Sequence, residues 1–300
     1  MIRTIKAICI LAVFLVGYNC AGIKNNQQIQ PIEVQGHRGD RGSFPENTIP
    51  AFLSAVKKGA AVIEMDVVIS KDQKVVVSHE TFMSAQYMNG LDGKPIKKDK
   101  EKSYNLFEMT YDSIKRFDSG SRGNAAFAGQ QKMKTYKPLL SEVIDSVENY
   151  ISKNKLKPVK YNIEIKSEKE DYNIRQPQPD LFSAMVIKII KDKGIEQKIN
   201  IQSFDPTVLN GIHKTYPKIQ IAFLVGEDTF IKNLSMLDFV PQIYSPYHKL
   251  LNKEEVALIR SLKIRVIPWT VNEDKDIDFM LRLKVDGIIT DYPEKVLGKL

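Results

Sequence analysis

Cysteine is nearly absent from this sequence of 300 residues, because its only two, Cys9 and Cys20, both lie among the first twenty. Two cysteines cannot build a disulfide framework, and their placement suits neither a zinc site nor a cysteine nucleophile. No low-complexity tract and no repeat of fixed period appears. With 43% hydrophobic and 27% charged residues, the composition is that of a globular protein and excludes a disordered, collagen-like or polytopic membrane chain.

The excess of positive charge is modest. The formal net charge is +8, and Arg3 and Lys6 supply two of these charges, which leaves +6 after residue 20. This balance suits an anionic substrate or surface. Nucleic-acid binding is the weaker interpretation, since the lysines are scattered among acidic residues and form no nucleic-acid motif.

The first 21 residues are predicted to be an export signal. Residues 1–6 are basic, and residues 7–16 form an apolar run that suits a secretory signal and is too short to cross a bilayer comfortably. Cys20 stands where a bacterial lipoprotein carries its acylated cysteine, but Gly17-Tyr18-Asn19 fits the usual small-residue motif poorly. We expect an exported protein, periplasmic or anchored to the bacterial envelope through Cys20, with ordinary signal-peptidase cleavage as the alternative.

Residues 31–300 alternate short β-branched runs with helical patterns, which is typical of βαβ units and a parallel sheet. The predicted strands are 32–36, 62–68, 160–166, 200–203, 220–225, 242–245, 265–270 and 287–290. The predicted helices are 46–58, 139–151, 180–193, 206–216, 253–262 and 274–283, with Asp205 and Asn252 as N-caps of two of them. Eight strands are what a closed barrel needs, so we predict an α/β fold, a TIM (β/α)8 barrel.

One segment interrupts this alternation. Residues 74–79 are strand-like, but only three residues separate them from the strand before, too few for a parallel crossover, so we predict an antiparallel hairpin. The expected register places Glu64 opposite His79, within a residue or two. Residues 80–137 follow with weak periodicity and many lysines. We interpret them as a small, partly helical insertion after the second strand.

The carboxyl ends of barrel strands meet at one mouth, where such folds place their active sites. Glu64 and Asp66 on the second strand, and Glu164 and Lys166 on the third, are two residues apart and share a face of their strand. Any one of these carboxylates alone could form a strand-end salt bridge. Three that converge call for a cation, and oxygen ligation by Glu64, Asp66 and Glu164 suits one divalent ion, Ca²⁺ or Mg²⁺.

Two of the four histidines, His37 and His79, flank this acidic cluster. They could serve as general base and general acid on either side of a phosphate, because histidine titrates near neutral pH. Arg38 and Lys166 would supply the positive charge that a phosphodiester transition state requires.

The remaining candidates at the mouth are Gln202, at the end of the fourth predicted strand, and Trp269, at the end of the seventh. Both are predicted to contact substrate. Trp269 could be a stacking wall for an apolar or polyol group, or a residue that merely fills the barrel rim. His213 and His248 are interpreted as surface residues.

Short motifs follow one another along about residues 33–297. They are Gly36-His37-Arg38-Gly39, Pro45-Glu46-Asn47-Thr48, Ile63-Glu64-Met65-Asp66-Val67, Val77-Ser78-His79, Asn162-Ile163-Glu164-Ile165-Lys166, Gln202-Ser203-Phe204, Pro268-Trp269-Thr270 and Thr290-Asp291-Tyr292-Pro293. As an ordered set they resemble the glycerophosphodiester phosphodiesterase family. The resemblance implies a barrel with an insertion after the second strand and a divalent cation on Glu64, Asp66 and Glu164. It also implies His37 and His79 as the acid–base pair, with Arg38 and Lys166 on the phosphate.

The resemblance further implies metal-dependent hydrolysis of glycerophosphodiesters to glycerol 3-phosphate and an alcohol. We take His37 as the base and His79 as the acid, and the reverse assignment stays open, as does attack by water or by the glycerol 2-hydroxyl. The family usually has aspartate where Glu80 stands, a departure that touches no expected metal ligand. The lysine-rich insertion is less typical and leaves the preferred alcohol open.

Two alternatives are kept. A phospholipase that acts on intact lipid headgroups would need an exposed apolar rim, and the insertion contains no obvious one. A non-catalytic lipoprotein that binds phosphorylated polyols would not need both histidines.

Overall fold

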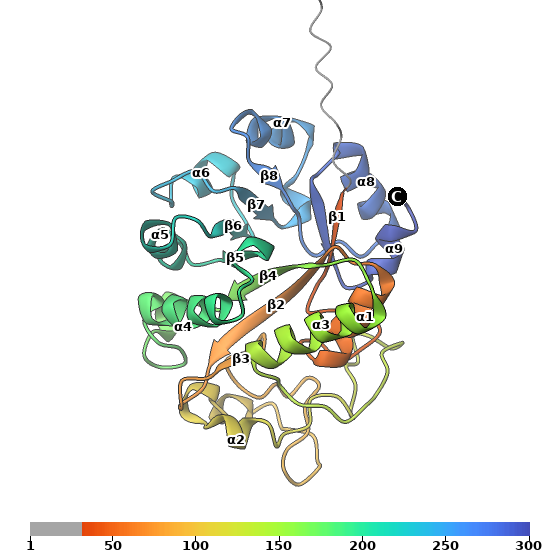
Figure 1. Ribbon diagram of the computed structural model, residues 1–300, viewed down its shortest axis with the longest axis vertical. Coiled ribbons are helices and arrows are strands. Elements are labelled where there is room, and N and C mark those ends of the chain that lie inside the picture. The colour runs from red at the N-terminus through yellow and green to blue at the C-terminus, as the bar shows by residue number, and fades with distance from the viewer. Residues whose placement is uncertain (1–31) are drawn as a thin grey trace, which may run out of the picture. The chain divides into compact units, whose positions relative to one another are not determined.

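Eight parallel strands form the core of residues 32–300, the part of the chain that this computed structural model describes. They are β1 (Glu33–Gly36), β2 (Val62–Ile69), β4 (Lys160–Ile165), β5 (Ile199–Ser203), β6 (Gln220–Val225), β7 (Ile243–Pro246), β8 (Arg265–Val266) and β9 (Gly287–Thr290). Their order is β8-β7-β6-β5-β4-β2-β1-β9, and the helices surround them (Figure 1). The predicted barrel is confirmed, whereas the predicted export signal and Cys20 lie outside the described residues.

The barrel nearly closes between β8 and β9. The backbone N–H of Ile289 donates to the oxygen of Pro268 at 3.0 Å, and the N–H of Val271 donates to the oxygen of Ile289 at 2.9 Å. The segment after β8 therefore completes the ring. The predicted strand 265–270 is too long, because Pro268 has no N–H to donate and β8 ends at Val266.

The helices pack outside the strands. They are α1 (Ile49–Lys58), α3 (Leu140–Asn154), α4 (Pro179–Asp192), α5 (Pro206–Thr215), α6 (Phe230–Leu234), α7 (Lys253–Ser261), α8 (Asp274–Leu283) and α9 (Pro293–Leu297). The side chains of Asp205 and Asn252 cap α5 and α7 as predicted. Helices α6 and α9 are not predicted from the sequence, because five residues are too few to show a helical period. None of the helices in residues 32–300 combines the length and apolarity that crossing a membrane requires.

Helix α1 begins three residues later than the predicted helix 46–58. Asn47 has a positive φ of 56°, which a helix does not allow, and Thr48 then caps α1 with its side chain. The late start frees Glu46 and Asn47 from the helix. Both side chains reach the mouth of the barrel, as described below.

The interior of the barrel is partly polar beneath its mouth. The amide nitrogen of Asn162 donates to Gln35 and to Gln202, each at 2.9 Å, and Asn200 donates to Asn162 at 2.6 Å. All four side chains are buried. Because each amide has a partner, this layer holds the Gln202 side chain in one orientation.

The predicted hairpin is confirmed, with β3 (Val75–Val77) antiparallel to β2. The ladder pairs Val67 with Val77, one residue away from the predicted register. The turn is centred on Asp72, because the Ser70 N–H donates to the oxygen of Lys74. The ladder ends at Val77, so His79 lies beyond it and is not paired with Glu64.

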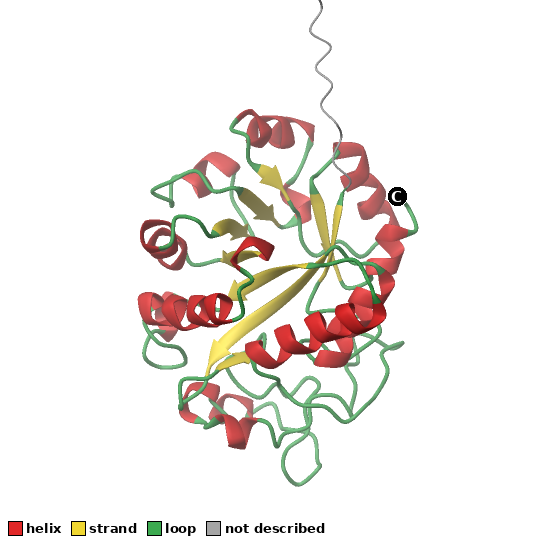
Figure 2. Ribbon diagram, in the orientation of Figure 1, coloured by secondary structure: helices red, strands yellow, loops and turns green. Residues whose placement is uncertain are grey.

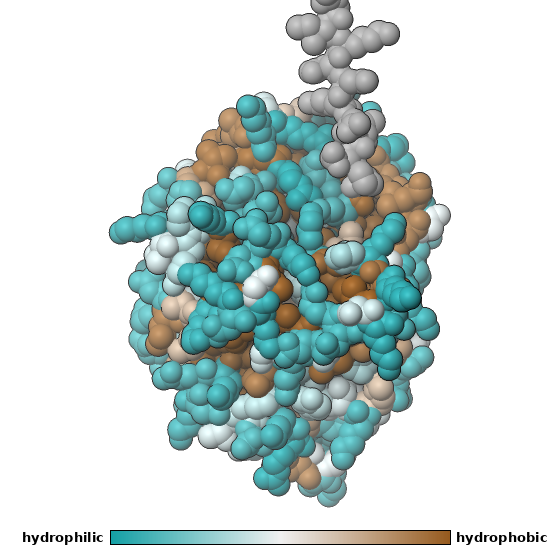
Figure 3. All heavy atoms as spheres, in the orientation of Figure 1, coloured by the Kyte–Doolittle hydropathy of each residue, from teal (hydrophilic) through white to brown (hydrophobic). Residues whose placement is uncertain are grey.

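The insertion follows β3 and is mostly loop (Figure 2), with the short helix α2 (Tyr111–Ile114) and the 3₁₀ turns η1 (Glu101–Ser103) and η2 (Leu106–Glu108). Its hydrophobic side chains form a cluster with Val68 of β2 and Val76 of β3, in which Met83 and Ile114 are fully buried. The side chains over the insertion are mainly hydrophilic on the face in Figure 3. The insertion is thus a small polar layer laid over one side of the barrel.

Candidate active site

Glu64, Asp66 and Glu164 meet at the mouth of the barrel, as the sequence predicts. The β2–β4 register places Asp66 directly beside Glu164, and Glu64 lies two residues earlier on the same face of β2. One carboxylate oxygen from each residue lies within 4.8 Å of the other two, and all three residues are buried. Three carboxylates this close repel one another, so the arrangement requires compensating positive charge.

The three carboxyl groups differ in the direction in which their pKa values are shifted. Burial raises the pKa of Glu64 well above its usual value, and the charges of Asp66 and Glu164 raise it further. Burial also raises the pKa of Glu164. Burial alone would raise the pKa of Asp66, but the Arg38 guanidinium lowers it below the usual range. Asp66 is therefore the most readily ionised of the three, yet its buried Oδ1 accepts no hydrogen bond.

Arg38 connects these carboxylates to the β1–α1 loop. Its backbone has a positive φ of 52°, and its N–H donates to Glu64 Oε2 at 2.8 Å. Its side chain donates to Glu46 Oε1 at 2.7 Å and lies 3.3 Å from Asp66 Oδ2. Asn47 also donates to Asp66 Oδ2, at 2.8 Å. Glu46 and Asn47, which precede α1, thus supply hydrogen-bond partners to Arg38 and Asp66. The sequence pointed to these two residues only as part of a motif.

His37 is held by a carboxylate from the far end of the chain. Its Nδ1 lies 2.7 Å from Oδ1 of Asp291, whose Oδ2 accepts a 2.7 Å hydrogen bond from Asn272. Burial lowers the pKa of His37, although Asp291 opposes this shift. Burial would raise the pKa of Asp291, but His37 brings it down to about 2. Ionised Asp291 can only accept, so His37 carries its proton on Nδ1 and turns Nε2 away from Asp291.

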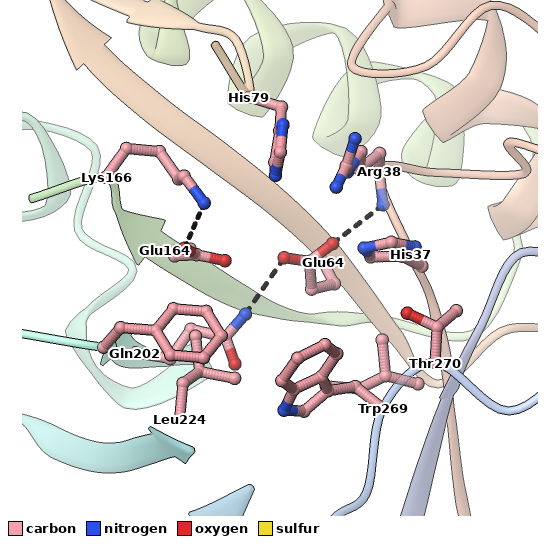
Figure 4. A pocket seen from close by; sticks show the side chains of 12 residues that line it. His37, Arg38, Glu64, His79, Glu164, Lys166, Gln202, Leu224, Trp269 and Thr270 are labelled. Atoms are coloured by element: carbon pink, nitrogen blue, oxygen red, sulfur yellow. Dashed lines mark hydrogen bonds and ion pairs between the residues drawn. The ribbon is translucent and has the colours of Figure 1, made fainter. Parts of the chain in front are cut away.

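His79 has a similar partner. Its Nδ1 lies 3.2 Å from Oε1 of Glu80, and its side chain is 32% exposed. In Figure 4 the rings of His37 and His79 approach the Glu64 carboxylate from two sides. Lys166 donates to Glu164 Oε1 at 2.7 Å. The structure therefore brings together every histidine, carboxylate and cation that the sequence analysis selected for this site.

A cavity of about 210 Å³ opens over these groups, lined at one end by the polar residues and at the other by Phe204, Leu224, Trp269 and Ile289. Every predicted site residue except Asp66 lines it, including Gln202, which donates to Glu64 at 3.0 Å. The Trp269 ring packs edge-on against Phe204 at 5.4 Å. The sequence analysis missed the other apolar residues, because hydrophobic strand ends look alike whether they face a cavity or the core.

Two further predictions about individual residues can be compared with the structure. His213 is exposed on α5, as expected. His248 is buried, and the prediction that it lies on the surface is wrong. Its backbone N–H donates to the oxygen of Trp269, which draws the segment after β7 against the rim.

Comparison with known proteins identifies the family. The family model described as "Glycerophosphoryl diester phosphodiesterase family" matches residues 37–295. A glycerophosphodiester phosphodiesterase from Caldanaerobacter subterraneus is 30% identical over 265 residues, which cover 88% of this chain and 96% of the relative. One from Bacillus altitudinis is 30% identical over 271 residues, with 88% and 96% covered.

Solved structures share the fold. A crystal structure from Silicibacter pomeroyi, assigned as a glycerophosphoryl diester phosphodiesterase, has a TM-score of 0.79 and 26% identity, with 88% of this chain and 91% of that chain covered. A phosphodiesterase from Oleispira antarctica, solved with the product sn-glycerol-3-phosphate, has a TM-score of 0.70 and 19% identity, with 89% and 95% covered. The chain therefore belongs to the glycerophosphoryl diester phosphodiesterase family of enzymes.

Proposed function

We propose that this enzyme hydrolyses glycerophosphodiesters to glycerol 3-phosphate and an alcohol, with a divalent cation on Glu64, Asp66 and Glu164. The observation that carries the proposal is one cavity in which two carboxylate-bound histidines flank a buried carboxylate cluster. The named activity of relatives that align over nearly their whole length supports it.

The carboxylate cluster suits a hard cation. Oxygen atoms from three residues lie close enough to share one ion, and the buried Asp66 Oδ1 accepts no hydrogen bond, with Lys166 Nζ 3.9 Å away. No histidine or cysteine belongs to the cluster within residues 32–300, which favours Ca²⁺ or Mg²⁺ over zinc. When bound, such a cation polarises the phosphoryl group and lowers the pKa of a coordinated hydroxyl.

The histidines divide the proton transfers. His37 Nδ1–H is committed to Asp291, so its Nε2 is free to accept the proton of the attacking hydroxyl, either water or the glycerol 2-hydroxyl. Attack by water gives glycerol 3-phosphate directly, whereas attack by the 2-hydroxyl gives a cyclic phosphate that water must then open. As the new P–O bond forms, the bond to the alcohol oxygen breaks and its electron pair stays on that oxygen. His79 gives this oxygen a proton. Lys166 and Arg38, both on the cavity wall, offset the negative charge of the phosphoryl oxygens.

One observation bears on the phospholipase alternative. Phe204 and Tyr247 both pack against Trp269, which lines the cavity, and they are 39% and 37% exposed. This aromatic edge comes from the barrel loops, not from the insertion. Two half-exposed rings fall short of the large contiguous apolar patch that marks a membrane-interaction site. We therefore favour water-soluble diesters and include lipids in the test.

Export stays a prediction from the sequence. We propose that residues 1–21 direct the chain to the bacterial envelope and that Cys20 is the site of a lipid anchor. Mass spectrometry of the membrane fraction tests this directly. An N-terminal acylated cysteine at position 20 would support the anchor, and an unmodified N-terminus produced by cleavage near it would favour a freely exported enzyme.

The activity is tested by release of glycerol 3-phosphate from a panel of glycerophosphodiesters, and by release of the headgroup from phospholipids and lysophospholipids alongside. Each assay is run as prepared, after EDTA, and after Ca²⁺ or Mg²⁺ is added back. We expect release from the water-soluble diesters that stops with EDTA and returns with one of the ions. Release that is indifferent to EDTA would contradict the cation. Turnover of lipids alone would favour the phospholipase, and no turnover with a folded, metal-loaded protein would favour a binding role.

A further inference from the structure

A buried polar cluster lies behind His79, on the side away from the cavity. Glu80 accepts from His79 Nδ1 through Oε1 at 3.2 Å and from the Tyr87 hydroxyl through Oε2 at 2.8 Å. Lys137 lies 3.4 Å from the same hydroxyl and donates to the Ser78 hydroxyl at 2.8 Å. Both Tyr87 and Lys137 belong to the insertion, so the insertion reaches the site through this cluster.

Lys137 is an unusual residue to bury. Only 3% of it is exposed, and within residues 32–300 no carboxylate lies in ion-pair distance of its ammonium group. Burial lowers its pKa, while Glu80, Glu46 and Asp66 oppose this shift. Burial would raise the pKa of Glu80, but His79 and Lys137 lower it below the usual range. An isolated buried ammonium is costly, so its position suggests a role beyond packing.

The contact between Glu80 and Nδ1 orients the His79 ring. A carboxylate on Nδ1 fixes the plane and the tautomer of an imidazole and leaves Nε2 for the substrate side. Figure 4 shows the His79 ring reaching into the cavity beside Arg38. The pair repeats the arrangement of His37 and Asp291, with a longer contact of 3.2 Å in place of 2.7 Å.

We propose that Glu80, held by the Tyr87 hydroxyl of the insertion, which Lys137 contacts in turn, is a positioning residue that orients His79 to protonate the leaving alcohol. The inference rests on the proposed hydrolysis and deepens it. In the step, His79 Nε2–H transfers its proton to the alcohol oxygen as the P–O bond breaks, and the imidazole keeps Nδ1–H on Glu80. The insertion therefore takes part in the reaction as well as covering the barrel.

Two substrates separate this role from a structural one. The alcohol released from glycerophosphocholine is a poor leaving group that needs a proton. The p-nitrophenyl ester of glycerol 3-phosphate releases p-nitrophenolate instead, a stable anion that needs no proton to depart. Glu80→Gln should lower kcat on glycerophosphocholine by about tenfold to a hundredfold, part of what a general acid contributes. The same variant should stay within about threefold of wild type on the p-nitrophenyl ester. Glu80→Asp should restore part of the lost rate.

A matched control is Glu101→Gln. Glu101 is also a buried carboxylate of the insertion, where it accepts from the Ala85 N–H at 3.0 Å and pairs with Lys98, without contacting His79. This variant should change kcat on the two substrates by the same factor. Tyr87→Phe removes one hydroxyl that donates to Glu80. It should also lower kcat more on glycerophosphocholine than on the p-nitrophenyl ester, by a smaller factor than Glu80→Gln. The test therefore stands even if Glu80→Gln folds poorly.

The outcomes are distinct. An equal loss on both substrates for Glu80→Gln and Tyr87→Phe, or no loss on either, would overturn the positioning role and leave the cluster as an anchor of the insertion. Wild-type protein that is folded, metal-loaded and inactive on both substrates would instead overturn the proposed function, and this inference with it. A selective loss on glycerophosphocholine, with partial rescue by aspartate, supports the role.

Discussion

His37 Nδ1 and Asp291 Oδ1 lie 2.7 Å apart, although the two residues are 254 positions apart in the sequence. They follow β1 and β9, which pair in parallel over their whole length, so the pairing of the first and last strands creates the contact. Asn272 holds the second oxygen of Asp291. The site therefore has a histidine whose proton position is set by residues from the opposite end of the chain.

Asp291→Asn should lower kcat by about a hundredfold, within the range for a general base, because the imidazole loses the acceptor that fixes its tautomer. His37 acts as a base only when unprotonated, and burial lowers its pKa below 6.5. In wild type, kcat/KM should therefore fall with a midpoint below pH 6.5 as the pH decreases. Asp291 raises that pKa, so the midpoint in the variant should move to still lower pH.

The measurement is the pH profile of kcat/KM for glycerophosphodiester hydrolysis. Asp274→Asn, at an exposed position of α8, is the control and should reproduce the wild-type profile. A wild-type midpoint above pH 6.5, or a profile that Asp291→Asn leaves in place, would remove His37 from the role of base.

Glu164→Gln should weaken the binding of Ca²⁺ or Mg²⁺ by at least about tenfold, the smallest loss usual for residues around a metal site. The variant keeps the size of the side chain and removes one of three charges in the cluster. Isothermal titration calorimetry measures the affinity without relying on turnover. Glu254→Gln, in the exposed first turn of α7, is the control. Equal affinities in both variants would exclude Glu164 as a ligand.

Gly39→Ala should reduce both stability and activity. Gly39 has a φ of +85°, and a Cβ there would lie 2.6 Å from the carbonyl carbon of Ala51 in α1. The loop that carries His37 and Arg38 would have to shift. Gly93 has a φ of +76° with open space around it. Gly93→Ala should therefore lower the free energy of unfolding only by the backbone strain, about 1–2 kcal/mol. Thermal unfolding and glycerol 3-phosphate release compare the two, and similar activities would show that the loop tolerates the contact.

Phe182→Ala should lower the free energy of unfolding by about 3–5 kcal/mol, because the ring is fully buried between α4 and the barrel. Leu181 precedes it on the same helix and is 51% exposed. Leu181→Ala should change the stability by no more than about 0.5 kcal/mol. Urea unfolding measures both. Comparable losses would mean that α4 packs on the barrel by a different face.

Local signals in the sequence were reliable where the physics is local. Asp205 and Asn252 cap helices α5 and α7 because a cap depends on the next three residues only. The predicted start of α1 was wrong by three residues, because Asn47 has a positive φ and its side chain donates to Asp66 across the mouth. The prediction that His248 lies on the surface was wrong for the same reason, because its backbone bonds to the distant Trp269 segment, a contact that the local sequence does not reveal.

The sequence by itself determined the barrel, the insertion after the second strand, and the types of residue at the strand ends. These features depend on the periodicity of strands and helices and on short ordered motifs, which are local properties of the sequence. Only the tertiary structure decided which of those residues meet. The β2–β4 register sets Asp66 beside Glu164, the pairing of β1 with β9 brings Asp291 to His37, and the fold of the insertion carries Lys137 behind His79. These contacts depend on strand register and loop path, which are set by packing over the whole molecule and leave no local pattern.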